Sequence, residues 1–263
     1  MPINTLNDYL AALKQLAIWN KTTTRTTVAA VPFSMFDVAG YPGAGTLAIG
    51  NTANGVVPTD AVAGYPVITN FAGGATGYLS RVTFSNTVAA RVALYDRVFA
   101  AGAYSFNSDI TLASQPSYAG RIPNGDYKGL ELWLEAVTAF TGNQSIRIQY
   151  LDQDGNAGDT GTIATGITPI VGRMYRMPYA AGDTGIQRIN VVTSTVSSAG
   201  TFNVMILRKL FEGRVKAAND GDTFNPLRTG NIRVYEDSAL YVVVSTDATS
   251  AGYPSLDIEI ASY

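Results

Sequence analysis

Cysteine and histidine are both absent from this chain of 263 residues. Their absence excludes a cysteine nucleophile, a Ser-His catalytic triad and a zinc site built from His and Cys ligands. It also leaves no disulfide bond to stabilise the fold. Stability must therefore come from core packing, with oligomerisation as a further source.

Charged residues are scarce, at 14% of the chain, whereas an ordinary soluble domain has about 25%. The formal net charge is −2, and the sequence shows no basic footprint of the kind that binds nucleic acid. The densest basic group is small and is typical of a solvated face: Arg208, Lys209, Arg214 and Lys216. A chain this poor in charge favours assembly with partners that cover its surface.

Long hydrophobic runs are also missing. No apolar run approaches the ~20 residues that a membrane-spanning helix needs. Residues 1–4 lack the basic and apolar regions of a signal peptide. We therefore expect a protein that is made in a cytoplasm and contacts no membrane.

A helical pattern opens the chain. Thr5 and Asp8 have the spacing of a capping box, with Asp in place of the usual Glu or Gln. Apolar residues then follow at helical spacing: Leu6, Tyr9, Leu10, Leu13, Leu16 and Ala17. The pattern predicts a short helix that ends near Trp19. Such a helix is not stable alone in water, so its apolar stripe must dock on its own domain or on a neighbouring subunit.

Residues 21–76 are rich in Thr, Ala, Gly and Pro, and Asp37 and Asp60 are the only charged residues between positions 26 and 80. A structureless loop of this length is unusual inside a compact domain. We therefore predict that residues 1–76 form the helix and an extended arm that lies over another protein. The expected interface residues, for each of which packing within the chain is the alternative, are Leu10, Leu13, Phe33, Phe36, Tyr41 and Tyr65.

From Tyr78 onward the apolar pattern has a period of two, which is typical of strands with one buried face. The cleanest alternation covers residues 145–150, and turn signals such as Asn124-Gly125 separate the strands. Many short strands with regular turns predict an all-β fold, an antiparallel sandwich over residues 77–263. A division into two smaller sandwiches near Thr168 is the alternative.

One segment has the spacing of a metal-binding loop. Asp152, Asp154 and Asn156 match the first three oxygen ligands of a calcium loop. Ala157 stands where such a loop needs Gly, and Ile163 stands where it needs Glu. A hairpin turn is therefore the main interpretation, and a weak calcium site is the alternative.

A catalytic pair of carboxylates is not evident. Glu131 and Glu135 are four residues apart on one predicted strand, which places them roughly 13 Å apart by strand rise. Both glycosidase mechanisms need a shorter separation. Trp133, between them, is expected in the core. We predict no enzyme activity, no catalytic residue and no cofactor, with a glycosidase or carbohydrate-binding module as a less favoured alternative.

Five segments between residues 78 and 211 carry a family resemblance. They are Leu94-Tyr95-Asp96-Arg97, Leu132-Trp133-Leu134-Glu135, residues 149–155 (QYLDQDG), residues 181–185 (AGDTG) and Leu207-Arg208-Lys209-Leu210. Together they resemble structural proteins encoded among the virion genes of tailed bacteriophages. None of the five is a catalytic signature.

The resemblance implies a virion component, and within that class a capsid decoration, or cement, protein with a jelly-roll-like sandwich. It implies the major capsid protein and further copies of this chain as partners, with a trimer expected. A neck, tail or receptor-binding fibre component is the nearest alternative, although no sustained heptad pattern is present. A jelly-roll major capsid protein is a further one.

Overall fold

The computed structural model describes residues 3, 5–106, 109–166, 169–194 and 199–263. Nearly all regular structure in this part of the chain is antiparallel β-sheet, which confirms the predicted all-β class. The α-helices are short, namely α1 (Leu6–Ala11) and α2 (Pro226–Thr229). No helix in the described residues is long and apolar enough to cross a membrane.

The strands form three sheets. The first sheet has the order β15 (Asp220–Phe224), β5 (Gly77–Asn86), β18 (Ser255–Ser262), β1 (Leu13–Lys21) and β3 (Gly40–Tyr41), with β16 (Arg233–Val234) also paired to β5. The central sheet has the order β12 (Met174–Arg176), β8 (Leu130–Ala136), β14 (Thr201–Val215), β6 (Ala90–Ser105), β17 (Leu240–Thr246) and β2 (Pro32–Ser34), with β4 (Asn51–Val56) also paired to β6. The third sheet has the order β10 (Ala157–Asp159), β9 (Ser145–Asp152), β13 (Ile186–Ser194) and β7 (Ile110–Thr111), with β11 (Ile163–Ala164) also paired to β9.

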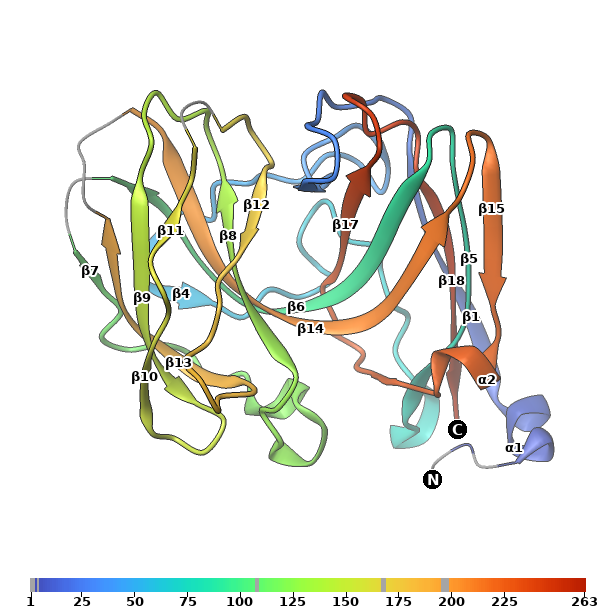
Figure 1. Cartoon of the computed structure of the whole chain (residues 1–263). Helices are drawn as coiled ribbons and strands as arrows, with labels where there is room; N and C mark the ends of the chain where they lie inside the picture. The colour runs from blue at the N-terminus through green and yellow to red at the C-terminus, as the bar shows by residue number, and fades with distance from the viewer. Residues whose placement is uncertain (1–2, 4, 107–108, 167–168, 195–198) are drawn as a thin grey trace.

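The central sheet is shared by two sandwiches. Its long strands β6 and β14 pair along almost their whole lengths and run across both halves of the molecule (Figure 1). One half of this sheet packs on the first sheet around a core that contains Trp19, Phe84 and Leu94. The other half packs on the third sheet around a core that contains Tyr150 and Phe202. The two sandwiches therefore have one layer in common.

Strands from both ends of the chain meet in these sheets. β1 pairs with β18, and β2 pairs with β17. Segments on the two sides of the predicted boundary at residues 76 and 77 therefore belong to the same sheets. The alternative division near Thr168 falls outside the described residues.

The predicted N-terminal helix is correct at its start and wrong at its end. Its capping box forms as expected, because Thr5 Oγ1 accepts from the Asp8 N–H at 3.1 Å and Asp8 Oδ2 accepts from the Thr5 N–H at 2.9 Å. The helix ends at Ala11, and the next residues form strand β1. Pairing with β18 and burial of Trp19 in the first core stabilise the strand, whereas a helix this short has little stability of its own.

The predicted arm also needs a correction. Within residues 32–66, Phe36, Leu47 and Tyr65 pack on the face of the central sheet that points away from the two sandwich cores. The sheet presents Trp133 and Tyr241 among other apolar side chains on that face. A sheet with apolar residues on both faces needs a cover on both, so this segment folds back onto its own chain.

Candidate functional site

The structure divides the six predicted interface residues into two groups. Phe33, Phe36 and Tyr65 are buried within the chain, so their role is intramolecular packing and they are not free to contact a partner. The other three are exposed: Leu10, Leu13 and Tyr41. Only the exposed three stay candidates for contact with another protein.

Leu10 lies in α1 and Leu13 starts the strand that follows it, and both are grouped here with two other exposed leucines of α1 and α2 under the name α1 surface. It consists of Leu6, Leu10, Leu13 and Leu227, whose side chains are 63–94% exposed. Leu6 and Leu227 also line one groove of about 360 Å³, to which Ile3 and Tyr9 contribute. The helices α1 and α2 lie at the same end of the molecule (Figure 1), and Leu6 of one and Leu227 of the other line the same groove.

Polar contacts fix α1 to the first sheet. Lys14 Nζ donates to the carbonyl oxygens of Tyr9 at 2.7 Å and Ala12 at 3.2 Å, at the end of the helix. The Tyr9 hydroxyl donates to Glu259 Oε1 of β18 at 2.8 Å. Burial and this bond to a carboxylate raise the pKa of Tyr9, so the hydroxyl keeps its proton and its contact. The helix is therefore fixed to the first sheet, although none of its residues is buried.

The two glutamates considered as a catalytic pair lie on the face of β8 that carries Trp133 and points away from the sandwich cores. Glu131 Oε2 accepts from Trp133 Nε1 at 2.9 Å and from the Tyr95 hydroxyl at 3.2 Å, and Oε1 pairs with Lys209 at 3.2 Å. Burial and the charge of Glu131 raise the pKa of Tyr95. The carboxylate of Glu131 is thus engaged in contacts that fasten β8 to β6 and β14.

Glu135 is fully buried on the same face of β8. It accepts hydrogen bonds from the Tyr241 hydroxyl and from Asn203 Nδ2, the latter at 2.9 Å. Burial and the nearby Glu135 charge raise the pKa of Tyr241. These contacts join β8 to β14 and β17 and give the carboxylate a structural role.

The segment considered as a calcium loop is a hairpin turn between β9 and β10. Asp152 Oδ1 accepts from the backbone N–H groups of Asp154 and Asn156, both at 2.8 Å, and Oδ2 accepts from Asn156 Nδ2 at 3.1 Å. Burial on its own would raise the pKa of the Asp152 carboxyl. The hydrogen bonds outweigh it and lower the pKa below its usual range. The Asp152 carboxylate thus organises the turn, as the main interpretation of this segment expected.

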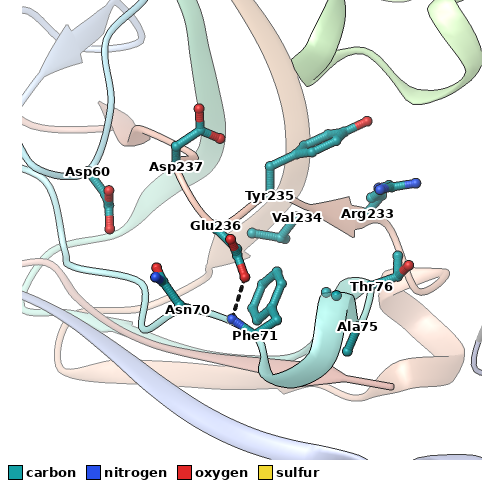
Figure 2. A pocket seen from close by; sticks show the side chains of 12 residues that line it. Asp60, Asn70, Phe71, Ala75, Thr76, Arg233, Val234, Tyr235, Glu236 and Asp237 are labelled. Atoms are coloured by element: carbon teal, nitrogen blue, oxygen red, sulfur yellow. Dashed lines mark hydrogen bonds between the residues drawn. The ribbon is translucent and has the colours of Figure 1, made fainter.

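A polar pocket of about 430 Å³ lies where the segment after residue 66 meets the loop before β17 (Figure 2). Its carboxylates include Asp60, Glu236 and Asp237. Glu236 Oε1 accepts from the Phe71 N–H at 2.5 Å, and Asp60 Oδ2 accepts from the Ile68 N–H at 2.7 Å. Two of these acids therefore fasten loops. Among the described residues no group of three or more such side chains is arranged to hold a metal ion.

A buried charged cluster, which the sequence reasoning missed, lies at the middle of β6. Asp96 is fully buried and pairs with Arg121 and with Arg208, whose Nη2 is 3.2 Å from Oδ2. It also accepts from the Ser238 hydroxyl at 3.0 Å and the Ala239 N–H at 3.1 Å. The available signal was the charged dipeptide of Asp96 and Arg97 inside a long apolar strand. This cluster is structural: the Asp96 carboxylate accepts from two guanidinium groups, a hydroxyl and a backbone N–H, although Nε of Arg208 is left without a partner.

Comparison with known proteins adds little to this geometry. No protein-family model matches the chain, and no curated protein sequence matches it. Among solved structures, the chain is similar to that of infectious bursal disease virus, Gt strain, with a TM-score of 0.19 and 10% identity over 95% of this chain and 80% of that one. A mutant VP2 protein of the same virus, in T=1 particles, is similar with a TM-score of 0.18 and 10% identity over 95% of this chain and 76% of that one. Likenesses with such TM-scores carry no argument about family or function.

Proposed function

We propose that this protein is a non-enzymatic structural component of a tailed-phage particle, where it acts as a capsid cement protein. The resemblance of segments within residues 78–211 to tailed-phage virion proteins supports the class. The α1 surface is the observation that carries the proposal, because it supplies a place for contact with another protein. The buried glutamates and the calcium-like hairpin, in contrast, have structural roles.

The α1 surface is suited to docking. Full burial of a leucine side chain contributes roughly 1.5–3 kcal/mol, and exposed apolar side chains that gather in one place mark interaction sites. Leu6, Leu10, Leu13 and Leu227 are all largely exposed, and charged residues are scarce in the chain. We propose the major capsid protein as the occupant of this surface. Modest contacts of this kind become strong when many copies bind one shell.

Self-association completes the proposal, with a trimer as the expected state. A cement protein stabilises capsomers through many contacts over a large area. A symmetric oligomer would present several α1 surfaces at once to the capsid. Analytical ultracentrifugation of the purified protein measures this state directly.

The first test is the copy number of the protein in purified particles that carry its gene. On a denaturing gel, a band comparable with that of the major capsid protein supports the cement role. A faint band contradicts that role and assigns the protein to the neck, tail or fibre. The absence of a band overturns the virion proposal, and binding to polysaccharides would then be measured.

A second test addresses the surface. Particles from a phage that lacks this gene are mixed with the purified protein, and bound protein is measured after sedimentation. The double substitution Leu6→Ser and Leu10→Ser should weaken binding at least tenfold without unfolding the protein, since α1 has no buried residues. Tyr253→Ser is the matched control, because this exposed side chain precedes the opposite end of β18. Equal binding by all three proteins would exclude the α1 surface.

A further inference from the structure

An apolar pocket of about 410 Å³ lies between residues 46–65 and strand β6. Its walls are mostly hydrocarbon: Phe36, Ile49, Val56, Val57, Val62 and Ala100. Val62 is exposed, whereas Ala100 is fully buried, so the pocket leads from the surface to the central sheet. Its size falls within the range of pockets that bind small molecules.

One charged residue lines this apolar pocket. Arg97 of β6 is 2% exposed, and its Nη1 donates to the Tyr65 hydroxyl at 3.2 Å. The guanidinium carbon lies 5.9 Å from the centre of the Phe36 ring and 5.1 Å from that of Tyr241. Aromatic faces therefore surround the cation.

Two nitrogens of this guanidinium have no partner. Nε and Nη2 of Arg97 are buried and make no hydrogen bond to any described residue. Its neighbour Asp96, in contrast, has two arginine partners. Glu135 is the acid whose charge reaches Arg97, but its carboxylate is hydrogen-bonded to Tyr241 and Asn203. Buried donors without an acceptor are unfavourable, so this edge of the guanidinium points to a missing hydrogen-bonding partner.

The free nitrogens indicate the kind of anion. Nε and Nη2 form one edge of the planar guanidinium, and that edge matches the two oxygens of a carboxylate. The apolar walls suit a hydrocarbon body and disfavour a phosphate, which would be desolvated at greater cost. Both nitrogens are shielded from water, so contact with a carboxylate requires a change in the rotamer of a neighbouring side chain.

We propose that this pocket binds a small aliphatic monocarboxylate, with the carboxylate on the Nε and Nη2 edge of Arg97 and the hydrocarbon chain between residues 46–65 and β6. The site goes beyond the cement role and does not depend on it. The side chains of Val56 and Val62 would contact the hydrocarbon chain.

Calorimetric titration of the whole chain tests the proposal, with octanoate as the probe and 1-octanol as a neutral probe of the same tail length. Octanoate should bind saturably at one molecule per chain and at least tenfold more tightly than 1-octanol. An absence of saturable octanoate binding would overturn the proposal. Equal affinity for the two probes would also overturn it, because the guanidinium would then have no part in recognition.

Substitutions identify the site. Arg97→Met should reduce the affinity for octanoate at least tenfold and leave that for 1-octanol unchanged, which a purely structural role of Arg97 does not predict. Unchanged octanoate binding by this folded variant would refute the site. If Arg97→Met does not fold, the substitution Val56→Phe is used instead. It narrows the pocket and should lower the affinity for octanoate and for 1-octanol at least tenfold. Leu227→Ser, in the α1 surface, is the control that should change neither affinity.

Discussion

Asp96 and Arg97 are adjacent in β6 and have opposite surroundings. Asp96 lies beside two guanidinium groups, a hydroxyl and a backbone N–H. Arg97 lies on the other face of the strand, among Phe36, Tyr65 and Tyr241, with two nitrogens unpartnered. The charge of Asp96 therefore stabilises the fold, whereas Arg97 keeps one edge of its guanidinium without an acceptor, which is the edge assigned to a ligand in the proposal above.

We expect Asp96→Asn to lower the free energy of unfolding by about 3 kcal/mol or more. Removal of one partner from a buried ion pair leaves the other charge uncompensated, and here Arg121 and Arg208 would both lose their carboxylate. Urea unfolding followed by far-UV circular dichroism measures the change. Asp237→Asn is the control, because this half-exposed carboxylate lies 3.9 Å from Arg121 and its loss should cost less than about 1 kcal/mol.

Strand β1 shows how two periodic patterns can share the same residues. Leu10, Leu13 and Ala17 fit one helical stripe, and Ala17 with Trp19 equally fit one face of a strand. Pairing with β18 decides between them, since it buries Ala17 and Trp19 and leaves Leu16 and Ile18 exposed. That partner lies at the far end of the chain, so local spacing could not indicate it.

Two neighbouring substitutions distinguish these patterns experimentally. In the strand, Leu16→Lys should change the free energy of unfolding by about 0.5 kcal/mol or less, because Leu16 is exposed. Ala17→Lys should cost at least about 2 kcal/mol, because it places an ammonium group in the first core. In a helix the two would share the apolar stripe and have similar effects. If chemical denaturation gave similar losses of unfolding free energy for Leu16→Lys and Ala17→Lys, the strand assignment would be contradicted.

Strand β8 shows what the sequence could and could not predict. Its alternating pattern predicts the strand itself, and Leu130, Leu132 and Leu134 do face a core. The opposite face carries Glu131 and Glu135, for which the sequence suggests contact with water. Both are buried. Glu131 is held by Tyr95, Arg176 and Lys209 of other strands. Glu135 is held by Tyr241 and Asn203, which also bond to Ser34 and Leu47 of the segment of residues 32–66. Burial of this second face depends on contacts distant in sequence.

The candidate site shows the same limit. Leu10 and Leu13 could be proposed as interface residues because they repeat within an apolar stripe. Leu227 stands alone in a polar stretch, and only the fold places α2 beside α1. The unpartnered edge of Arg97 likewise depends on where Tyr65 and Tyr241 lie. Contacts between distant segments therefore define both proposed binding sites.

The two sandwiches are connected more tightly than two domains joined by a linker. The ladder between β6 and β14 passes from one to the other with shifts in register. The core under residues 32–66 also joins them, since it contains Trp133 of β8 together with Tyr241 of β17. Loss of either sandwich would expose part of that shared core. Stability should therefore belong to the whole molecule.

We expect a single unfolding transition, which the two tryptophans can test. Trp19 is buried between the first and central sheets, and Trp133 is buried beneath residues 32–66. Trp133→Phe leaves Trp19 as the reporter, and Trp19→Phe leaves Trp133. In each variant, the midpoint of urea unfolding by tryptophan fluorescence should coincide with that by far-UV circular dichroism. Because each variant is compared with itself, the stability cost of the substitution cancels. Separate midpoints in either variant would mean that the shared layer does not couple the sandwiches, and that each unfolds as an independent unit.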